Sequence, residues 1–220
     1  MSSTQPSSPR RGRGRPKAVD DRQQRGMIVD VAMPLFLAKG YGKTSMNEIA
    51  AAAHVSLSTI YRFFPGKQDL FAAIVASHRE TMLALPGDYD GLPLDEALAR
   101  IFRLGLDSEA SQRREALMAM FMVEARQFPE LMPVMVEHGP KQSKQLLAAW
   151  LERQTRLGFA QATDPVAAAG MIMDIVFGAA ALKAPGSPIW PEGSERQDYL
   201  RRCFRMLADG LARSPASAQS

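Results

Sequence analysis

The most restrictive feature of this sequence is the stretch 45–66, which encodes two short helices with their own start and stop signals. Ser45-Met46-Asn47-Glu48 is a capping box, in which a hydroxyl and a carboxylate satisfy the free amides of a helix start. The helix that it opens is expected to end near Ala53. Ser56 can cap a second helix, Leu57 to Phe63, which Pro65-Gly66 stops.

The segments around this pair complete a recognisable layout. His54 falls in the turn, where Gly adopts a left-handed backbone more easily but His is tolerated. Apolar residues at three- and four-residue spacing predict a supporting helix from Asp20 to Lys39, and Pro34 should kink it because proline removes a backbone hydrogen bond. A longer helix is expected from Lys67 to Leu83. The pattern indicates a helix-turn-helix DNA reader.

The remainder of the chain is also helical in pattern, without strand-like alternation of useful length. Proline and glycine at Pro129, Gly139-Pro140 and 185–191 are expected to separate the helices. The predicted fold class is therefore all-α. The helices expected here are Pro93 to Asp107, Gln112 to Phe128, Glu130 to Glu137, Lys141 to Leu157, Pro165 to Leu182 and Glu192 to Ala212.

Composition narrows the class of protein further. Apolar residues make up 46% of the 220 residues and charged ones 23%, which is ordinary for a globular chain. The single cysteine, Cys203, excludes an intrachain disulfide, and we expect a cytoplasmic protein without a membrane span. Residues 1–70 hold eleven Lys or Arg against five Asp or Glu. Because of this excess of positive charge, the N-terminal part of the chain is expected to bind a polyanion.

The first 19 residues are predicted to be a disordered basic tail, because they hold too few apolar side chains to offset ordering. Within this tail, residues 11–17 alternate cations with glycines and resemble an AT-hook, which would place Arg13 and Arg15 in the minor groove of A·T-rich DNA. The alternative is a flexible leader that adds affinity without sequence preference. Residues 215–220 are expected to form a second disordered tail.

A longer set of residues forms a recognisable signature across positions 36–71: Phe36, Gly40, Tyr41, Thr44, Ile49, Ala50, Ala53, Val55, Ser56, Thr59, Ile60, Tyr61, Phe63, Phe64, Lys67, Leu70 and Phe71. This signature resembles that of the TetR family of bacterial repressors. The sequence departs from the family pattern at His54 and Ser58, where glycine is commoner. Farther on, residues 124–131 with Gly139-Pro140 are similar to the C-terminal domain of AefR- and AcrR-like members.

The resemblance implies a division of labour along the chain. Residues 20–66 would form the DNA-binding domain, 67–84 a connecting helix, and 85–214 a helical ligand-binding and dimerisation domain. Two helices, Val166 to Leu182 and Glu195 to Leu211, would form a four-helix interface with a second copy of the chain. The first of them has a small-residue face that allows a close helix contact, made of Ala167, Gly170, Asp174, Gly178 and Ala181. Two readers would then fit successive major-groove faces of a near-palindromic operator.

The DNA-binding candidates follow from the position of the second short helix. Its N-terminal residues Leu57, Ser58 and Thr59 should face the bases, whereas Tyr61, Lys67 and Thr44 should contact phosphates. The full set of DNA-binding candidates is Thr44, Ser56, Leu57, Ser58, Thr59, Tyr61, Arg62, Lys67, Arg13 and Arg15.

The helices of residues 85–214, which we call the body, carry a set of Met, aromatic and small residues. These residues are the candidate lining of a pocket for a small hydrophobic or amphipathic effector. The alternative is that this stripe is plain core. Glu124 and Arg126 could add polar groups to such a pocket. The candidates are Phe102, Met118, Phe121, Met122, Ala125, Trp150, Met171, Ile175 and Phe177.

The predicted function is that of a homodimeric, sequence-specific transcriptional repressor, which its ligand releases from double-stranded DNA. Control of an efflux system is implied by the resemblance alone. An activator or a corepressed protein would use the same parts. One rival is an architectural DNA-binding protein that senses nothing. The other is an all-α enzyme, but three His and one Cys assemble no catalytic or metal constellation, so neither catalysis nor a cofactor is expected.

Overall fold

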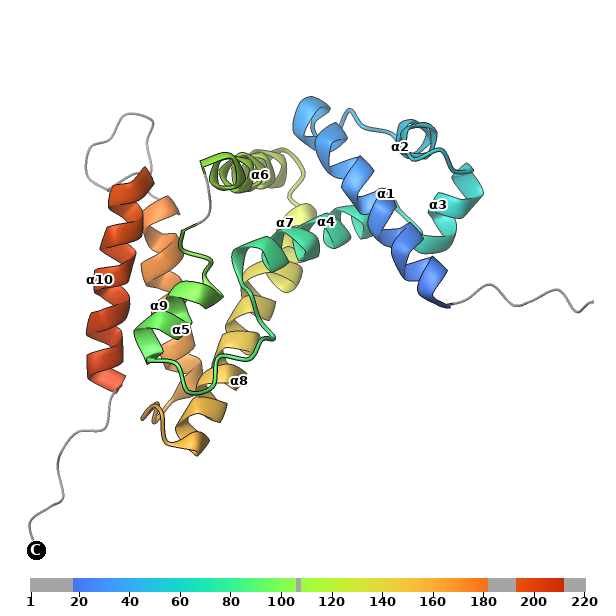
Figure 1. Ribbon diagram of the computed structural model, residues 1–220. Coiled ribbons are helices and arrows are strands. Elements are labelled where there is room, and N and C mark those ends of the chain that lie inside the picture. The colour runs from blue at the N-terminus through green and yellow to red at the C-terminus, as the bar shows by residue number, and fades with distance from the viewer. Residues whose placement is uncertain (1–17, 106–107, 182–192, 212–220) are drawn as a thin grey trace, which may run out of the picture.

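The computed structural model describes residues 18–105, 108–181 and 193–211, and every regular element within these ranges is a helix. Figure 1 shows α1–α3 at one end of the molecule and α9 and α10 at the other, with α4, α6 and α7 between them. The helices are α1 (Ala18–Lys39), α2 (Met46–Ala52), α3 (Leu57–Phe63), α4 (Lys67–Met82), α5 (Leu94–Ile101), α6 (Ser108–Gln127), α7 (Leu131–Val136), the π-helical turn η1 (Glu137–Lys141), α8 (Gln142–Leu157), α9 (Pro165–Ala181) and α10 (Gly193–Leu211).

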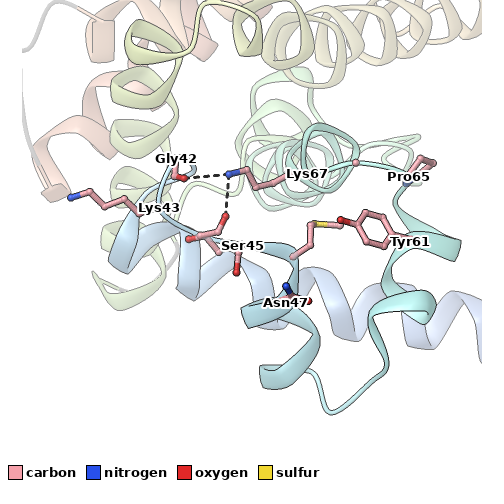
Figure 2. Close-up of a pocket in the computed structure, with 10 residues that line it drawn as sticks. Gly42, Lys43, Ser45, Asn47, Tyr61, Pro65 and Lys67 are labelled. Atoms are coloured by element: carbon pink, nitrogen blue, oxygen red, sulfur yellow. Dashed lines mark hydrogen bonds between the residues drawn. The ribbon is translucent and has the colours of Figure 1, made fainter.

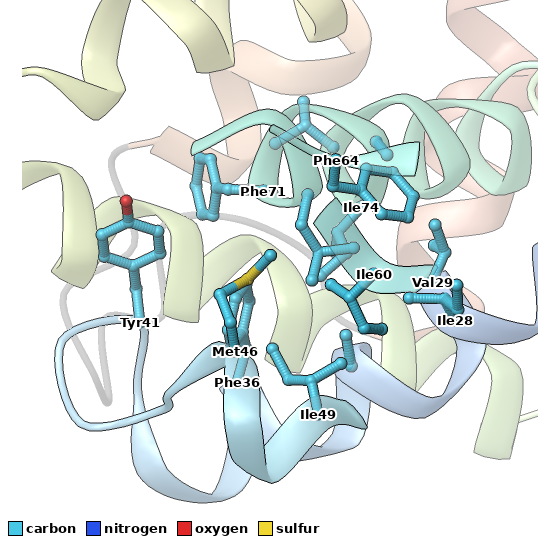
Figure 3. Packing of buried hydrophobic residues seen from close by; sticks show 14 of the residues in the cluster. Ile28, Val29, Phe36, Tyr41, Met46, Ile49, Ile60, Phe64, Phe71 and Ile74 are labelled. Atoms are coloured by element: carbon cyan, nitrogen blue, oxygen red, sulfur yellow. The ribbon is translucent and has the colours of Figure 1, made fainter. Parts of the chain in front are cut away.

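The first hydrophobic core lies among α1–α4. Ile28, Phe36, Ile49, Ile60 and Phe64 are fully buried in it, and the short helices thereby bury one apolar face each (Figure 3). A seven-residue helix is marginal alone, because nucleation is costly, so this packing is what stabilises α2 and α3.

This core does not end where the sequence predicted the reader domain to end. It also includes Leu70 and Phe71 of α4, which lie beyond residue 66 and are fully buried. Phe121 of α6 and Leu131 of α7 belong to it as well, each with at most 1% of its surface exposed. Phe71 meets Phe121 edge to face with ring centroids 5.5 Å apart. The reader is therefore packed directly onto body helices.

A second core lies among α5, α8, α9 and α10. Phe102, Leu151, Ile172 and Phe204 are almost completely buried there, together with Leu83 just after α4. α9 packs on α8, and α10 packs on α5. The helix α4 thus contributes its first half to one core and leads into the other.

Three local predictions need correction. α5 ends at Ile101 rather than continuing to Asp107, because Arg103 and Gly105 both adopt positive φ, at 52° and 104°. Gly139-Pro140 does not separate two helices: η1 carries the backbone from α7 directly into α8, and a π-helical turn accommodates the missing amide of proline. α1 begins at Ala18, inside the segment predicted to be a disordered tail. Pro34 lies within this helix, and the predicted kink stays a prediction.

Candidate DNA-binding site

The start of α2 is held by the predicted capping box. The Ser45 backbone amide donates to Glu48 Oε2 at 2.9 Å, and the Glu48 amide donates to Ser45 Oγ at 3.2 Å. Lys39 at the end of α1 donates to Glu48 Oε1 at 2.7 Å. This lysine and the Ser45 amide lower the pKa of the Glu48 carboxyl to about 2. One carboxylate therefore fixes both the start of α2 and its attachment to α1.

The turn between α2 and α3 adopts the conformation expected from the sequence. His54 has φ 53°, in the left-handed region, and its side chain is exposed. Val55 donates its amide to Ala50 O at 3.0 Å and packs against the first core. The turn thus directs the chain into α3 without exposing an apolar side chain to solvent.

The N-terminus of α3 presents three hydroxyls. Ser56 Oγ accepts the Thr59 amide at 3.1 Å, and it also lies 2.8 Å from Ser58 Oγ and 2.7 Å from Thr59 Oγ1. Ser58 is exposed, whereas Leu57 is half-buried against the first core. Of the three base-facing candidates, Ser58 is therefore the exposed one, and Ser56 serves as a helix cap.

A depression of about 490 Å³ lies beside this helix, between the loop 42–47 and the start of α4 (Figure 2). Tyr61 and Lys43, both exposed, contribute to its wall. A phenol and an ammonium at the edge of a reader helix suit a phosphate oxygen. Lys43 was missed by the sequence analysis, and the available signal was its position immediately before the Thr44-Ser45 start of α2.

Two predicted phosphate contacts have other partners in this structure. Thr44 is 1% exposed, and its Oγ1 donates to Gly40 O at 2.8 Å. Lys67 Nζ donates to Tyr41 O at 2.7 Å and to Thr44 O at 3.0 Å, and it lies 4.3 Å from the centroid of the Tyr41 ring. Burial lowers the pKa of Lys67, and the Glu124 carboxylate opposes that shift. The hydrogen bonds of both residues therefore stabilise the conformation of the loop between α1 and α2.

Of the remaining candidates, Arg62 is the one within the described residues. Arg62 is exposed and donates to Asp21 Oδ1 and Gln24 Oε1, each at 3.2 Å, so it connects α3 to α1. Arg13 and Arg15, with the proposed AT-hook, fall outside the described residues.

The end of α6 and the residue that follows it pack against the same loop, a contact that was not predicted from the sequence. Phe128 meets Tyr41 edge to face at 5.4 Å, and a Cβ built on Gly42 would lie 2.6 Å from Phe128 Cζ. Glu124 is 7% exposed, and a Cβ on Gly40 would lie 2.4 Å from its Oε1. Gly40 also has a φ of 82°, a left-handed conformation that favours glycine, whereas a side chain at position 42 would have to displace the Phe128 ring. Glu124 therefore lies against the helix-turn-helix end of the molecule.

The nine pocket candidates are distributed over different environments. Phe121 belongs to the first core, whereas Phe102 and Trp150 belong to the second, with Ile175 and Phe177 packed against it. Ala125 is buried and Met118 half-buried. Met122 and Met171 are 42% and 47% exposed. The structure thus splits this set between two cores and the surface, and a shared ligand site for it stays a prediction.

Residues 18–105, 108–181 and 193–211 include no group of three His, Cys, Asp or Glu placed to hold a metal ion. Over the same residues, no helix is long and apolar enough to cross a membrane.

An exposed α3 N-terminus, supported by α1, α2 and α4, makes this end of the molecule a helix-turn-helix module. The family description "Bacterial regulatory proteins, tetR family" matches residues 28–74, and "AefR-like transcriptional repressor, C-terminal domain" matches residues 96–209. The chain belongs to the TetR family of transcriptional regulators, and both resemblances noted in the sequence are confirmed.

Individual relatives agree. The HTH-type transcriptional regulator YvkB of Bacillus subtilis is 32% identical over 151 residues, which cover 69% of this chain and 78% of the relative. AcrR of Shigella flexneri is 35% identical over 44% of this chain and 46% of its own length.

Solved structures show the same architecture. A TetR-family regulator from Mesorhizobium loti superimposes with a TM-score of 0.63 at 22% identity, over 88% of this chain and 98% of the other. The flavonoid-responsive regulator FrrA superimposes with a TM-score of 0.59 at 26% identity, over 89% of this chain and all of FrrA. The all-α fold, with an N-terminal helix-turn-helix domain and a helical C-terminal domain, is thereby confirmed.

Proposed function

We propose that the chain is a dimeric repressor that binds a near-palindromic operator in double-stranded DNA and is released by a small hydrophobic or amphipathic ligand. The observation that carries this proposal is the α3 N-terminus, where exposed Ser58 stands beside the depression that holds Tyr61 and Lys43. In the complex, Ser58 and Thr59 contact base edges, while Tyr61 and Lys43 contact the flanking phosphates. Because a repressor of bacterial chromosomal genes acts in the cytoplasm, this proposal includes a cytoplasmic location for the chain.

Dimerisation through α9 and α10 is supported by the side chains that these helices leave uncovered. Val166 and Met171 of α9 are 57% and 47% exposed, and Met206 of α10 is 74% exposed. Ala167 and Asp174 of the predicted small-residue face are exposed as well, and a Cβ on Gly178 would meet open space. An apolar face with small residues suits a close helix contact with a second copy.

Ligand release is supported by the way in which the two cores are connected. α4 places Phe71 and Ile74 in the first core and leads to Leu83 in the second. Glu124 and Phe128 press on the loop between α1 and α2. A ligand that favours a different packing of the body helices would therefore move α1–α3 in both subunits and change the spacing of the readers.

A hydrophobic effector is also supported by FrrA, whose name describes it as flavonoid-responsive. Control of an efflux system by this chain rests on its resemblance to AcrR- and AefR-like members. It would be tested by the identity of the genes beside the operator.

The proposal is tested with the purified full chain and a promoter fragment from beside its own gene, at fixed salt. A repressor protects a short near-palindromic segment, binds it at least about a thousandfold more tightly than random DNA, and is released by one compound from a panel of lipophilic molecules. Equal affinity for random DNA, unaffected by every compound, would leave the architectural function in its place.

Two variants connect this measurement to the site. Ser58→Ala should weaken operator binding by about 1 kcal/mol, because one hydrogen bond to a base is lost, and should relax the preference at one base position. Tyr61→Phe, which removes one hydroxyl, should weaken binding to all sequences similarly. Ser111→Ala on α6 is the matched control, since Ser111 lies outside the module.

A further inference from the structure

A cavity of about 540 Å³ lies where the end of α4, the connection to α5 and the start of α8 meet. Its walls combine leucines, among them the buried Leu83 and Leu85, with the guanidinium side chains of Arg79 and Arg103. The cavity therefore offers apolar surface and cationic groups to one ligand.

Arg79 has unused hydrogen-bonding capacity. Its side chain is 13% exposed, and Nη2 donates to Glu80 Oε1 at 3.2 Å. Nε and Nη1 are buried without a hydrogen-bond partner among the described residues. An unsatisfied buried N–H is costly, so a guanidinium left in this state gains from an additional acceptor. Because protein atoms cover both nitrogens, the guanidinium must rotate to present them to a ligand.

Arg103 is held beside the cavity by the turn that ends α5. Its φ of 52° lies in the left-handed region, which is common for the residue that follows a helix C-cap. The Arg103 amide donates to Arg100 O at 3.0 Å, and the Leu104 amide donates to Ala99 O at 2.8 Å, which is the hydrogen-bond pattern of a Schellman helix end. Arg103 is exposed, so this helix end places a second cation at the cavity.

Further arginines make the surroundings positive. Burial lowers the pKa of Arg114 on α6, and the positive charges of Arg196 and Arg103 lower it further, while Glu115 raises it. Among the lining residues, the carboxylate is Glu80, which is 68% exposed and already paired with Arg79. The C-terminal dipole of α4 opposes an anion, but two guanidinium charges outweigh its roughly half charge.

We propose that this cavity binds a carboxylate-bearing amphipathic molecule, with its apolar part against the leucines and its carboxylate between Arg79 and Arg103. Planar guanidinium groups match a carboxylate with paired hydrogen bonds. The proposal rests on the proposed function, since it assigns the class of the effector: an organic anion rather than a lipophilic cation. Because Arg79 lies on α4, the bound carboxylate acts directly on the helix that joins the two cores.

The test compares three probes with the same alkyl chain and different head groups: decanoate, decanol and decyltrimethylammonium. Calorimetry with the full-length chain should show decanoate binding at least about tenfold more tightly than either of the others, because only its head group pairs with guanidinium. Equal binding of all three, tighter binding of the ammonium compound, or binding by none would overturn the proposal.

Variants locate the site. Arg103→Ala and Arg79→Met should each weaken decanoate binding by about tenfold or more and leave decanol binding unchanged, which also shows that the variants are folded. Arg100→Ala is the matched control, because Arg100 is an exposed arginine of the same segment that pairs with Glu96 and does not line the cavity. An Arg100→Ala effect as large as that of Arg103→Ala would overturn the assignment.

The outcome is separable from that of the proposed function. Operator binding by the unliganded chain is measured in parallel, and its absence would count against the repressor whatever the probes do. Operator binding without a preference for decanoate would leave the repressor standing and remove the anionic effector. Release of the operator by decanoate, but not by decanol, would support both.

Discussion

The two cores are equally well buried, but they hold different parts of the molecule together. The first core buries Phe64 and Phe71 fully, and the loop beside it is held by hydrogen bonds from Lys67. The second core buries Phe204 equally well, and two of the helices that form it, α9 and α10, leave Met171 and Met206 exposed. The proposed DNA contacts thus lie at the first core, and the proposed contact with another subunit lies at the second.

The largest test of this contrast is Phe121→Ala. Phe121 comes from the body but is 1% exposed in the first core, so its truncation should cost about 3–5 kcal/mol in the free energy of unfolding, measured by urea denaturation. Phe159→Ala, at a site 49% exposed, should cost less than about 0.5 kcal/mol. A small loss at Phe121 together with weaker ligand binding would return this residue to the wall of a pocket.

The next test concerns His78, which lies in α4 where the reader meets α6. Burial and the charge of Arg114 lower its pKa from 6.5 to about 4, and its ring meets Phe121 at 5.4 Å. As pH falls, His78 is therefore protonated in the unfolded chain before it is protonated in the folded chain. The contribution of neutral His78 to the free energy of unfolding is complete above pH 6.5 and is lost as the pH falls to about 4.

His78→Leu should remove this dependence. Relative to the variant, the natural chain should lose on the order of 2–3 kcal/mol of unfolding free energy between these two pH values. Denaturant titrations at several pH values measure the difference. Parallel stability curves for the two proteins would show that His78 is not kept neutral by burial.

A smaller effect separates two lysines at the reader. Lys67→Met should cost about 2 kcal/mol in unfolding free energy, because the carbonyls of Tyr41 and Thr44 lose a donor. Lys43→Met should leave stability unchanged, weaken DNA binding, and reduce the salt dependence of binding by about one counterion. If Lys67→Met changed only DNA binding, Lys67 would be a phosphate contact as the sequence predicted.

The smallest expected effect concerns the open face of the body. Met206→Asp should raise the dissociation constant of the dimer by about tenfold or more, since a buried methionine contributes at least about 1.5 kcal/mol. Analytical ultracentrifugation measures this constant. Met122→Asp, at an exposed site on α6, is the control and should dissociate as the natural chain does. Equal shifts in both variants would place the interface elsewhere.

Local signals in the sequence accounted well for the reader. The Ser45 and Ser56 caps and the Pro65-Gly66 stop placed α2 and α3 within a residue of their observed limits, because capping and termination depend on near neighbours in the chain. The body was less predictable. Gly139-Pro140 was expected to end a helix, but packing against α4 and a π-helical turn carried the backbone through.

Side-chain roles were harder to predict than helices. Thr44 and Lys67 have the residue types of phosphate contacts, yet both are occupied by carbonyls of their own loop. Phe102 and Phe121 belong to the same set of predicted pocket residues, yet they lie in different cores. Periodicity shows which face of a helix is apolar, but it does not show which neighbour covers that face.

The sequence by itself therefore determined the helical class, the reader and the family, because helix periodicity, capping and the residues of the signature are local properties. The tertiary structure alone decided that α6 presses Glu124 and Phe128 onto the reader loop, and that Arg79 and Arg103 meet at one cavity. Those residues are far apart in the chain. Their meeting depends on the packing of whole helices, which no short window of sequence records.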